Sequence, residues 1–287
     1  MRTWAGLPFA TCVTRFENPP TIMNLLQAIV LAVVQGVSEF LPISSSGHLI
    51  LVPHFLGWPD QGLAFDVAVH VGTLLAVLIY FRKQLAALLR AWFGSVLQRT
   101  SSPDSRLAWQ LLVATIPVGL CGLLFDDYIE QHFRHPLFVA ATLAFFGLVM
   151  YAADRFGRGQ RDEYSVSWPQ ALVIGVAQAL ALMPGTSRSG ITMTAGRAFG
   201  LTRSAAARFS FLLAVPGIGA AGGYEGLKLA TGAAAVDWLP MVVGLVFSAL
   251  SGIACIHFMI RFIERIGLLP FTIYRLALAL VIVLVFA

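Results

Sequence analysis

Two short polar stretches carry side chains that suit chemistry, and each interrupts a hydrophobic segment. The stretch LPISSSGH contains Ser45 and His48 and lies just after Glu39, whereas PGTSRSG contains Arg188. A carboxylate or an imidazole can act as a base, a hydroxyl can act as a nucleophile, and a guanidinium fork matches the oxygens of a phosphate. These residue types favour a reaction on an anion, with phosphate as the best match.

Glu39 and Arg188 are difficult to explain as packing residues, because a charge in hydrocarbon is costly unless it lines a cavity or meets a partner. A single serine is explained more easily, since serines often bond to nearby helix backbone. Ser45 precedes His48 by about one helical turn, so we expect the hydroxyl and the imidazole to approach each other. We predict catalytic roles for Glu39, Ser45, His48 and Arg188.

The broken segments also provide groups that bind anions. If each break begins a new helix, free N–H groups and the positive end of the helix dipole face the same point. Serine is a good N-cap there, and glycine lets the backbone come close to a ligand. Gln35 shares a helical face with Glu39, because the two are four residues apart. The predicted substrate-binding residues are Gln35, Ser44, Ser46, Gly47, Thr186, Ser187, Ser189 and Gly190.

The composition places both stretches in a membrane protein. Of the 287 residues, 58% are hydrophobic and 11% are charged, whereas soluble domains carry about 25% charged residues. Lys and Arg outnumber Asp and Glu by 19 to 14, which fits cytoplasmic loops and anionic lipid better than a nucleic-acid partner. The three scattered cysteines show neither metal-ligand spacing nor a disulfide framework.

Six hydrophobic segments are long enough to cross a bilayer as helices. Two others, 24–58 and 170–200, are broken by Pro, Gly and Ser, which is typical of re-entrant helices. The sequence therefore predicts an all-α integral membrane protein with six transmembrane helices and two re-entrant helix pairs. The predicted spans are about 63–81, 107–125, 137–153, 209–224, 239–260 and 270–287.

The charges of the loops orient these spans. The basic loop 82–106 is predicted on the cytoplasmic side, and the acidic loop 126–136 outside. Segment 24–58 then enters from the outside, and segment 170–200 enters from the cytoplasm. By the same reasoning, three further basic residues are expected to be solvated on the cytoplasmic side: Arg197, Arg203 and Arg208.

The two broken segments indicate an internal repeat. Four pairs of identical residues align at one offset: Gln35 with Gln178, Ser44 with Ser187, Ser46 with Ser189, and Gly47 with Gly190. Each copy has one re-entrant segment and three spans, and an odd number of spans makes the second copy inverted. We predict an inverted-topology repeat, with copies 24–153 and 170–287, inside one membrane domain at 23–287.

Residues 1–22 are interpreted as an N-terminal extension, either disordered or preceding a true start at Met23, and not as a signal peptide. Asp66 and His70 are four residues apart at the start of a predicted span. They are expected either to line the cavity between the broken segments or to mark the outer end of that span.

The motifs QGVSEFLPISSSGH and PGTSRSG resemble those of the undecaprenyl-diphosphate phosphatases, the bacitracin-resistance protein family. The resemblance extends from Met23 to the end of the chain. It implies removal of the terminal phosphate of undecaprenyl diphosphate at the periplasmic side of the bacterial inner membrane. That reaction recycles the lipid carrier of peptidoglycan synthesis and gives resistance to bacitracin. The family's first motif begins with Glu or Gln, here Gln35, so Glu39 is the expected catalytic carboxylate.

The mechanism stays open between two variants at this point. Ser45 attacks the terminal phosphorus with His48 or Glu39 as the base, or the same pair activates a water. A divalent cation, Mg²⁺ or Ca²⁺, is left open as a cofactor that bridges Glu39 and the phosphates, although the sequence shows no closed metal cage. The predicted partners are the undecaprenyl diphosphate lipid and the membrane, without nucleic acid, and a second copy of the chain is left open.

Two other function classes compete with this interpretation. Broken helices that meet inside a membrane are also typical of secondary transporters, so the alternative is a polyprenyl-phosphate flippase or an anion transporter. The run Ser46-Gly47-His48 is shared with type-2 phosphatidic-acid phosphatases. However, Thr194 stands where the second motif of that class requires histidine, which disfavours it.

Overall fold

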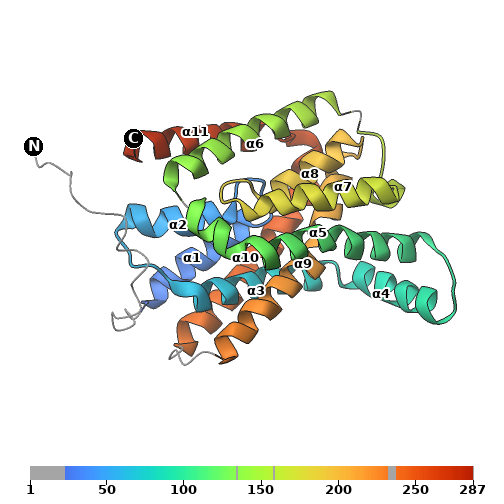
Figure 1. Cartoon of the computed structure of the whole chain (residues 1–287), viewed down its shortest axis with the longest axis horizontal. Coiled ribbons are helices and arrows are strands. Elements are labelled where there is room, and N and C mark those ends of the chain that lie inside the picture. The colour runs from blue at the N-terminus through green and yellow to red at the C-terminus, as the bar shows by residue number, and fades with distance from the viewer. Residues whose placement is uncertain (1–22, 134, 158, 232–236, 287) are drawn as a thin grey trace, which may run out of the picture.

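The computed structural model describes residues 23–133, 135–157, 159–231 and 237–286, and the predictions for residues 1–22 lie outside this part (Figure 1). The described residues are almost entirely helical and form no strand that belongs to a sheet. The helices are α1 (Leu25–Ser38), α2 (Ser45–Leu56), α3 (Gly62–Tyr80), α4 (Arg82–Leu97), α5 (Pro103–His132), α6 (Pro136–Phe156), η2 (Glu163–Ser165), α7 (Trp168–Ala179), η3 (Leu180–Leu182), α8 (Arg188–Ala198), α9 (Arg203–Thr231), α10 (Trp238–Ile266) and α11 (Leu269–Phe286).

Six of these helices are long and apolar enough to cross a membrane. Each of them overlaps one of the six predicted spans, and the observed ends differ from the predicted ones by up to six residues. The qualifying stretches are Gly62–Tyr80, Pro103–Phe125, Pro136–Phe156, Arg203–Leu227, Trp238–Ile266 and Leu269–Phe286. The prediction of an all-α integral membrane protein is therefore confirmed.

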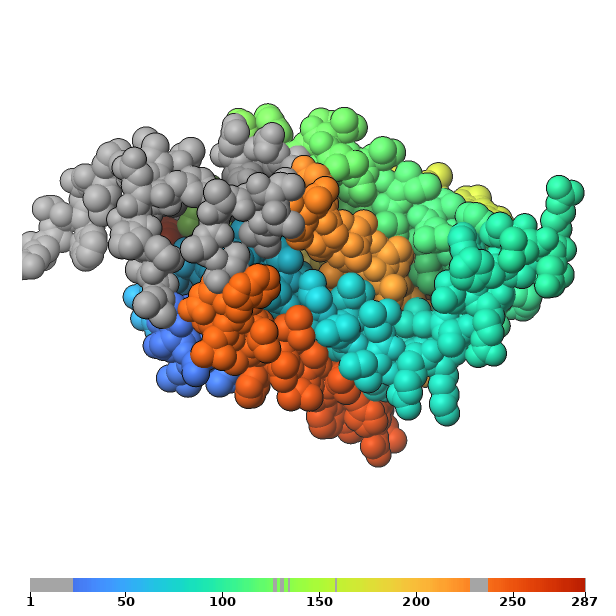
Figure 2. Space-filling model, turned by 90° about the horizontal axis from the view of Figure 1, so that it is seen from below, coloured from blue at the N-terminus to red at the C-terminus, as the bar shows by residue number. Residues whose placement is uncertain are grey.

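Helix α4 corrects the prediction of a plain loop at 82–106. Together with the start of α5, it projects from one end of the molecule (Figures 1 and 2). Because of its basic residues, α4 is not apolar enough to be recognised as a span, but hydrophobic side chains recur along it. Leu88 is buried, whereas Leu89 and Phe93 are exposed. A helix with a basic side and an apolar side is typical of the membrane interface.

The two predicted re-entrant segments each form a pair of short helices, and local sequence explains where they begin. Asn24 and Gln27 form a capping box at the start of α1, and Ser167 and Gln170 form another at the start of α7. Such reciprocal bonds satisfy two of the N–H groups that a helix start leaves unpaired. Each first helix then ends, and the chain turns before α2 or α8 begins.

The first short helix of each half packs on the second span of the other half. Helix α1 packs on α10, the second span of the other half, and α7 packs on α5, the second span of the first half. Glycines allow both approaches, because a Cβ on Gly36 would lie 2.0 Å from Ser251 Oγ, and one on Gly175 would lie 2.4 Å from the Ala114 carbonyl oxygen. This exchange of corresponding helices supports an internal repeat. The inverted orientation of the halves stays a prediction.

One end of the helix bundle is joined by an ion-pair cluster around Asp154 of α6. Its Oδ1 accepts hydrogen bonds from Arg197 Nε at 3.0 Å and from Arg203 Nε at 2.8 Å. Its Oδ2 accepts one from the backbone N–H of Leu268 at 3.1 Å. Arg197 is only 5% exposed, so the expectation that it is solvated was wrong. The Asp154 carboxylate, which is close in space but revealed by no local sequence pattern, makes the burial of Arg197 tolerable.

Candidate active site

The tips of the two re-entrant segments meet through side chains 149 residues apart in the sequence. Arg188 Nη2 donates a hydrogen bond to Glu39 Oε1 at 3.0 Å. Beside it, Ser189 Oγ donates to the backbone carbonyl of Leu41 at 3.0 Å. The structure thus brings the predicted carboxylate and the predicted cation into one site, with one residue from each half of the chain.

Glu39 is the centre of this site. It follows the last turn of α1, it is 6% exposed, and its two oxygens are both engaged. Oε2 accepts hydrogen bonds from Gln35 Nε2 at 3.0 Å and from Ser45 Oγ at 2.7 Å, in addition to the bond from Arg188 to Oε1. Bonds of this kind, with an ionised partner, are about twice as strong as neutral ones. The carboxylate therefore orders both tips.

Arg188 is the first residue of α8, and not all of the N–H donors of its guanidinium group are used in hydrogen bonds. Nη1 donates to the backbone carbonyl of Ser210 at 3.1 Å, and Nη2 donates to Glu39. Its Nε has no hydrogen-bond partner among the described residues, although it is buried. A buried donor without a partner is costly, so a ligand oxygen placed there would be favoured.

Ser45 and His48 do not approach each other as expected. Ser45 is the first residue of α2 and turns toward Glu39. His48 Nδ1 lies 2.7 Å from the Ser44 carbonyl oxygen, and Nε2 lies 2.6 Å from the Tyr274 hydroxyl of α11. Because a carbonyl oxygen only accepts, Nδ1 carries the proton and Nε2 accepts from Tyr274. Both imidazole nitrogens are thus occupied in this arrangement.

His70 of α3 is a neighbour of Glu39 that the sequence left undecided. Its Nε2 lies 3.9 Å from Glu39 Oε2, and its Nδ1 lies 2.7 Å from the Asp66 carbonyl oxygen. The side chain is 34% exposed. His70 therefore lines the open side of the site, whereas the Asp66 carboxylate accepts a hydrogen bond from Gln61 at 2.9 Å. The first of the two expectations holds for His70.

The turns before α2 and α8 have the same unusual backbone. Ser44 has φ 74° and Ser187 has φ 73°, a region that residues with a Cβ adopt at a cost of about 1–3 kcal/mol. Each serine also makes the same side-chain contact two residues on: Ser44 Oγ lies 3.4 Å from Ser46 Oγ, and Ser187 Oγ lies 3.3 Å from Ser189 Oγ. The aligned positions are thus equivalent in conformation as well as in residue type.

The two helix starts differ in what they leave free. At α8, Ser187 Oγ accepts from the N–H of Gly190 at 3.1 Å, as expected of an N-cap. At α2, Ser44 makes no such bond. The first turn of α2, which contains Ser45 and Gly47, is therefore the better anion site, because its N–H groups are not capped by that side chain.

The other predicted substrate-binding residues divide into two kinds. Gln35 Oε1 and Thr186 Oγ1 are buried and lack a hydrogen-bond partner among the described residues, so their hydrogen-bonding capacity is not used there. Ser46 is exposed beside Ser45. Ser187, Ser189 and Gly190 instead complete the second tip through bonds inside the protein. They shape the site and do not offer free hydroxyl groups.

Arg275 of α11 is a buried cation that the sequence reasoning missed. It is 0% exposed, and all of its hydrogen bonds go to backbone carbonyl oxygens, with no carboxylate partner in the described part of the chain. The acceptors are Leu143 at 3.0 Å, Pro42 at 3.3 Å, Thr186 at 3.0 Å, Thr142 at 3.4 Å and Gly185 at 2.9 Å. The available signal was an arginine inside the last apolar segment, which is rare in a membrane helix.

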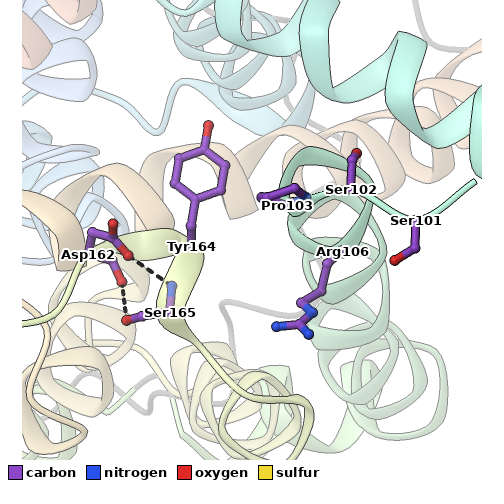
Figure 3. A pocket seen from close by; sticks show the side chains of 7 residues that line it. All are labelled: Ser101, Ser102, Pro103, Arg106, Asp162, Tyr164 and Ser165. Atoms are coloured by element: carbon purple, nitrogen blue, oxygen red, sulfur yellow. Dashed lines mark hydrogen bonds between the residues drawn. The ribbon is translucent and has the colours of Figure 1, made fainter.

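A hollow of about 390 Å³ lies elsewhere, between the start of α5 and the short helix η2. Figure 3 shows Arg106 and Tyr164 among its lining residues, with Ser165 bonded to Asp162. It contains none of the predicted catalytic residues. The hollow is therefore distinct from the site predicted at the two tips.

Comparisons with known proteins agree with the motifs. The model of a family described as "Bacitracin resistance protein BacA" matches residues 28–281. The chain is 55% identical over 268 residues to Undecaprenyl-diphosphatase 2 of Stutzerimonas stutzeri, covering 92% of this chain and 99% of that protein. It is 53% identical over 260 residues to Undecaprenyl-diphosphatase of Teredinibacter turnerae, covering 91% and 98%. It is 50% identical over 265 residues to the protein of that name from Nitrosococcus oceani, covering 92% and 100%.

Proposed function

Because this chain belongs to the BacA family of bacitracin resistance proteins, we infer that it is an undecaprenyl-diphosphatase. It hydrolyses undecaprenyl diphosphate to undecaprenyl phosphate and inorganic phosphate. The observation that carries this function is the contact of Ser45 and Arg188 with one carboxylate, Glu39. The flippase or transporter alternative is not favoured, because the relatives are named as diphosphatases over nearly their full length.

We propose that the reaction takes place at the bacterial inner membrane, with the site open toward the periplasm. The charge pattern supports this side, because the basic segment 82–106 is expected in the cytoplasm and segment 24–58 then enters from the outside. Ser45, Ser46 and His70 form the accessible edge of the first tip. A lipid diphosphate reaches this edge from the outer leaflet in the proposed orientation.

The diphosphate head binds between the two tips. The uncapped first turn of α2 presents N–H groups to phosphate oxygens, and Arg188 contributes its positive charge and the free N–H at Nε. Thr186 Oγ1 and Gln35 Oε1, which are buried without a partner among the described residues, are proposed to bind the head group as well. Phosphoryl transfer depends chiefly on positioning and on neutralising the equatorial oxygens, and these groups supply both.

Ser45 is the nucleophile in the proposed mechanism. Its Oγ attacks the terminal phosphorus, the bond from that phosphorus to the bridging oxygen breaks, and undecaprenyl phosphate leaves. The hydroxyl proton passes to Glu39 Oε2, which lies 2.7 Å away. A water then attacks the phosphoserine and the bond from phosphorus to the Ser45 oxygen breaks. Glu39 returns its proton to that oxygen, and the water's oxygen and protons leave with inorganic phosphate.

Glu39 is favoured over His48 as the base for Ser45. Glu39 already accepts the Ser45 proton in a hydrogen bond, whereas both nitrogens of His48 are bonded to Ser44 and Tyr274. His48 is assigned a positioning role through these contacts. In the competing variant, the same carboxylate activates a water in place of Ser45, and no phosphoserine forms. Trapping a phosphoserine would therefore distinguish the proposed mechanism from this variant.

A divalent cation fits the oxygen donors of this site. Glu39 supplies a carboxylate, and Gln35 Oε1 is a buried oxygen without a partner among the described residues; hard cations prefer such ligands. No cluster of three or more His, Cys, Asp and Glu side chains suited to a metal occurs in the described part of the chain. We propose that Glu39 and Gln35 would hold such a cation, which would neutralise negative charge on the phosphate oxygens.

The test of the function is phosphate release from undecaprenyl diphosphate by the purified protein in detergent. Wild type is expected to release one phosphate per lipid and to leave undecaprenyl phosphate. A protein that binds or moves the lipid without releasing phosphate is a transporter, which would refute the assignment.

The proposed orientation is tested by replacing Ser46 with a single cysteine and labelling it with a reagent that cannot cross the membrane. Reagent added from the periplasm is expected to label the cysteine. Labelling by cytoplasmic reagent alone would refute the orientation.

A further inference from the structure

Arg275 contacts both re-entrant tips from a helix that belongs to neither. Helix α11 runs along α6 (Figure 1), and its Arg275 reaches Pro42 in the first tip and both Gly185 and Thr186 in the second. The preceding residue, Tyr274, bonds to His48 at 2.6 Å. Two successive residues of α11 therefore contact the polar turns on which the proposed chemistry depends.

Three of the five carbonyl groups that Arg275 binds, those of Pro42, Gly185 and Thr186, lie one or two residues before the strained serines. Pro42 is two residues before Ser44, and Thr186 is the residue before Ser187. A left-handed conformation at a residue with a Cβ persists only when its surroundings hold it. Bonds to the preceding carbonyls fix the peptide groups that lead into each turn. The same guanidinium thereby restrains both turns relative to each other.

We propose that Arg275 is a positioning residue for the phosphoryl transfer: it fastens the turns at Ser44 and Ser187 so that Glu39 and Arg188 face the same phosphate. The proposal rests on the proposed function for its kinetic consequences and on the described contacts for its geometry. Arg275 does not touch the substrate, because it is fully buried behind the two turns. It acts through the backbone that carries the reacting side chains.

Only arginine fits this arrangement. Its planar group presents five N–H donors in a fixed fork, whereas lysine presents three donors at one point. The acceptors here come from three chain segments, represented by Pro42, Leu143 and Gly185. Gly190 leaves room for the fork, because a Cβ there would lie 3.1 Å from Arg275 Nη1. A side chain with fewer N–H donors leaves some of these buried carbonyl oxygens without a hydrogen bond.

The first experiment compares Arg275→Lys and Arg275→Met with the control Arg197→Lys. Arg197 is also a buried arginine that bonds to carbonyl oxygens, but it lies in the Asp154 cluster and not at the tips. We expect kcat to fall on the order of 10²-fold for Arg275→Met and less for Arg275→Lys, with KM changed by less than threefold, since small displacements of reacting groups have effects of this size. Arg197→Lys is expected to retain kcat at temperatures where it is folded.

The second experiment separates positioning from a general loss of stability. Glycine adopts positive φ without strain, so Ser44→Gly reduces the need for a restraint at the first turn. We expect the ratio of kcat with Ser44→Gly to kcat without it to be higher in the Arg275→Lys background than in the wild-type background. The double-mutant cycle measures this coupling directly. A wild-type kcat in Arg275→Lys, or equal effects of Ser44→Gly in both backgrounds, overturns the proposal.

Failure of the proposed function gives a different result. If wild type releases no phosphate from undecaprenyl diphosphate, the diphosphatase assignment fails. The same cycle is then read from the thermal unfolding midpoint, in which Ser44→Gly is expected to offset part of the loss caused by Arg275→Lys. Additive shifts in that midpoint refute the restraint of the turn by Arg275, whatever the protein catalyses.

Discussion

Ser45 Oγ lies 2.7 Å from Glu39 Oε2, across the turn that separates α1 from α2. The hydroxyl donates to a carboxylate whose other oxygen is bound by Arg188 at 3.0 Å. This relationship joins a candidate nucleophile, its proton acceptor and a phosphate-binding cation through one group. It also gives each of them a role that substitutions can separate.

Ser45→Ala is expected to lower kcat by several orders of magnitude, because it removes the nucleophile. Ser45→Thr retains the hydroxyl and should keep part of the activity. Ser251→Ala is the matched control, since its hydroxyl bonds only to carbonyl oxygens of its own helix. Rapid quenching of wild type with labelled terminal phosphate should trap phosphoserine. Full activity of Ser45→Ala would show that water, and not Ser45, attacks the terminal phosphorus.

Arg188→Ala is expected to reduce kcat on the order of 10³-fold, as arginines that neutralise a transferring phosphoryl group do. Arg188→Lys keeps the charge but loses the fork, and should recover only part of this loss. Steady-state phosphate release measures both. Turnover of Arg188→Ala close to that of wild type would show that the cation serves only the ion pair with Glu39.

Tyr274→Phe tests the role of His48. If Tyr274 acts by orienting the imidazole, its substitution should lower kcat by less than tenfold and should have no further effect in the His48→Ala background. Kinetics of the two single variants and the double variant give the coupling. Independent, multiplying effects would mean that the Tyr274 hydroxyl serves another group, contrary to the 2.6 Å contact.

His70→Gln and His70→Glu test the electrostatic environment of Glu39. The two variants place a neutral or a negative side chain about where His70 lies, 3.9 Å from the carboxylate. We expect a change of only a few fold for His70→Gln. For His70→Glu we expect a loss on the order of 10- to 100-fold, because like charges at this distance repel strongly near a protein surface. Equal activity of the two would remove His70 from the site.

Chelation tests the shared cation. Phosphate release should fall when EDTA is added and return with excess Mg²⁺ or Ca²⁺, and Gln35→Ala should require more cation for half-maximal activity. Gln178→Ala is the matched control, because Gln178 is the aligned glutamine of the second half and lies outside the cluster around Glu39. Unchanged turnover in EDTA would show that no divalent cation takes part in phosphate release.

Local sequence predicted the features that depend on charge and hydropathy. Glu39 and Arg188 stand out because a charge inside an apolar segment requires a partner, and the structure shows that each is the other's partner. The repeated Ser-x-Ser-Gly pattern was likewise informative, since Ser44 and Ser187 share one backbone conformation. Each of these signals can be recognised within a few residues of the chain.

The remainder depends on contacts that leave no local pattern. Helical spacing placed Ser45 near His48, but the first residue of a helix can turn toward the preceding segment, as Ser45 does toward Glu39. The partners of Arg275 are carbonyl oxygens, which every residue has, so no residue type marks its site. Helix α4 was missed because hydropathy identifies spans and not helices that carry basic residues along one side.

The separation of 149 residues between Glu39 and Arg188 has a consequence for biosynthesis. At about 5–20 residues per second, the ribosome adds the second residue roughly 7–30 s after the first. During that interval the first half is being inserted while Glu39 lacks its cationic partner. Insertion of the early segment is therefore expected to stay reversible until the second half arrives, and a nascent chain that stops before α8 contains Glu39 and Ser45 but is expected to be inactive without Arg188.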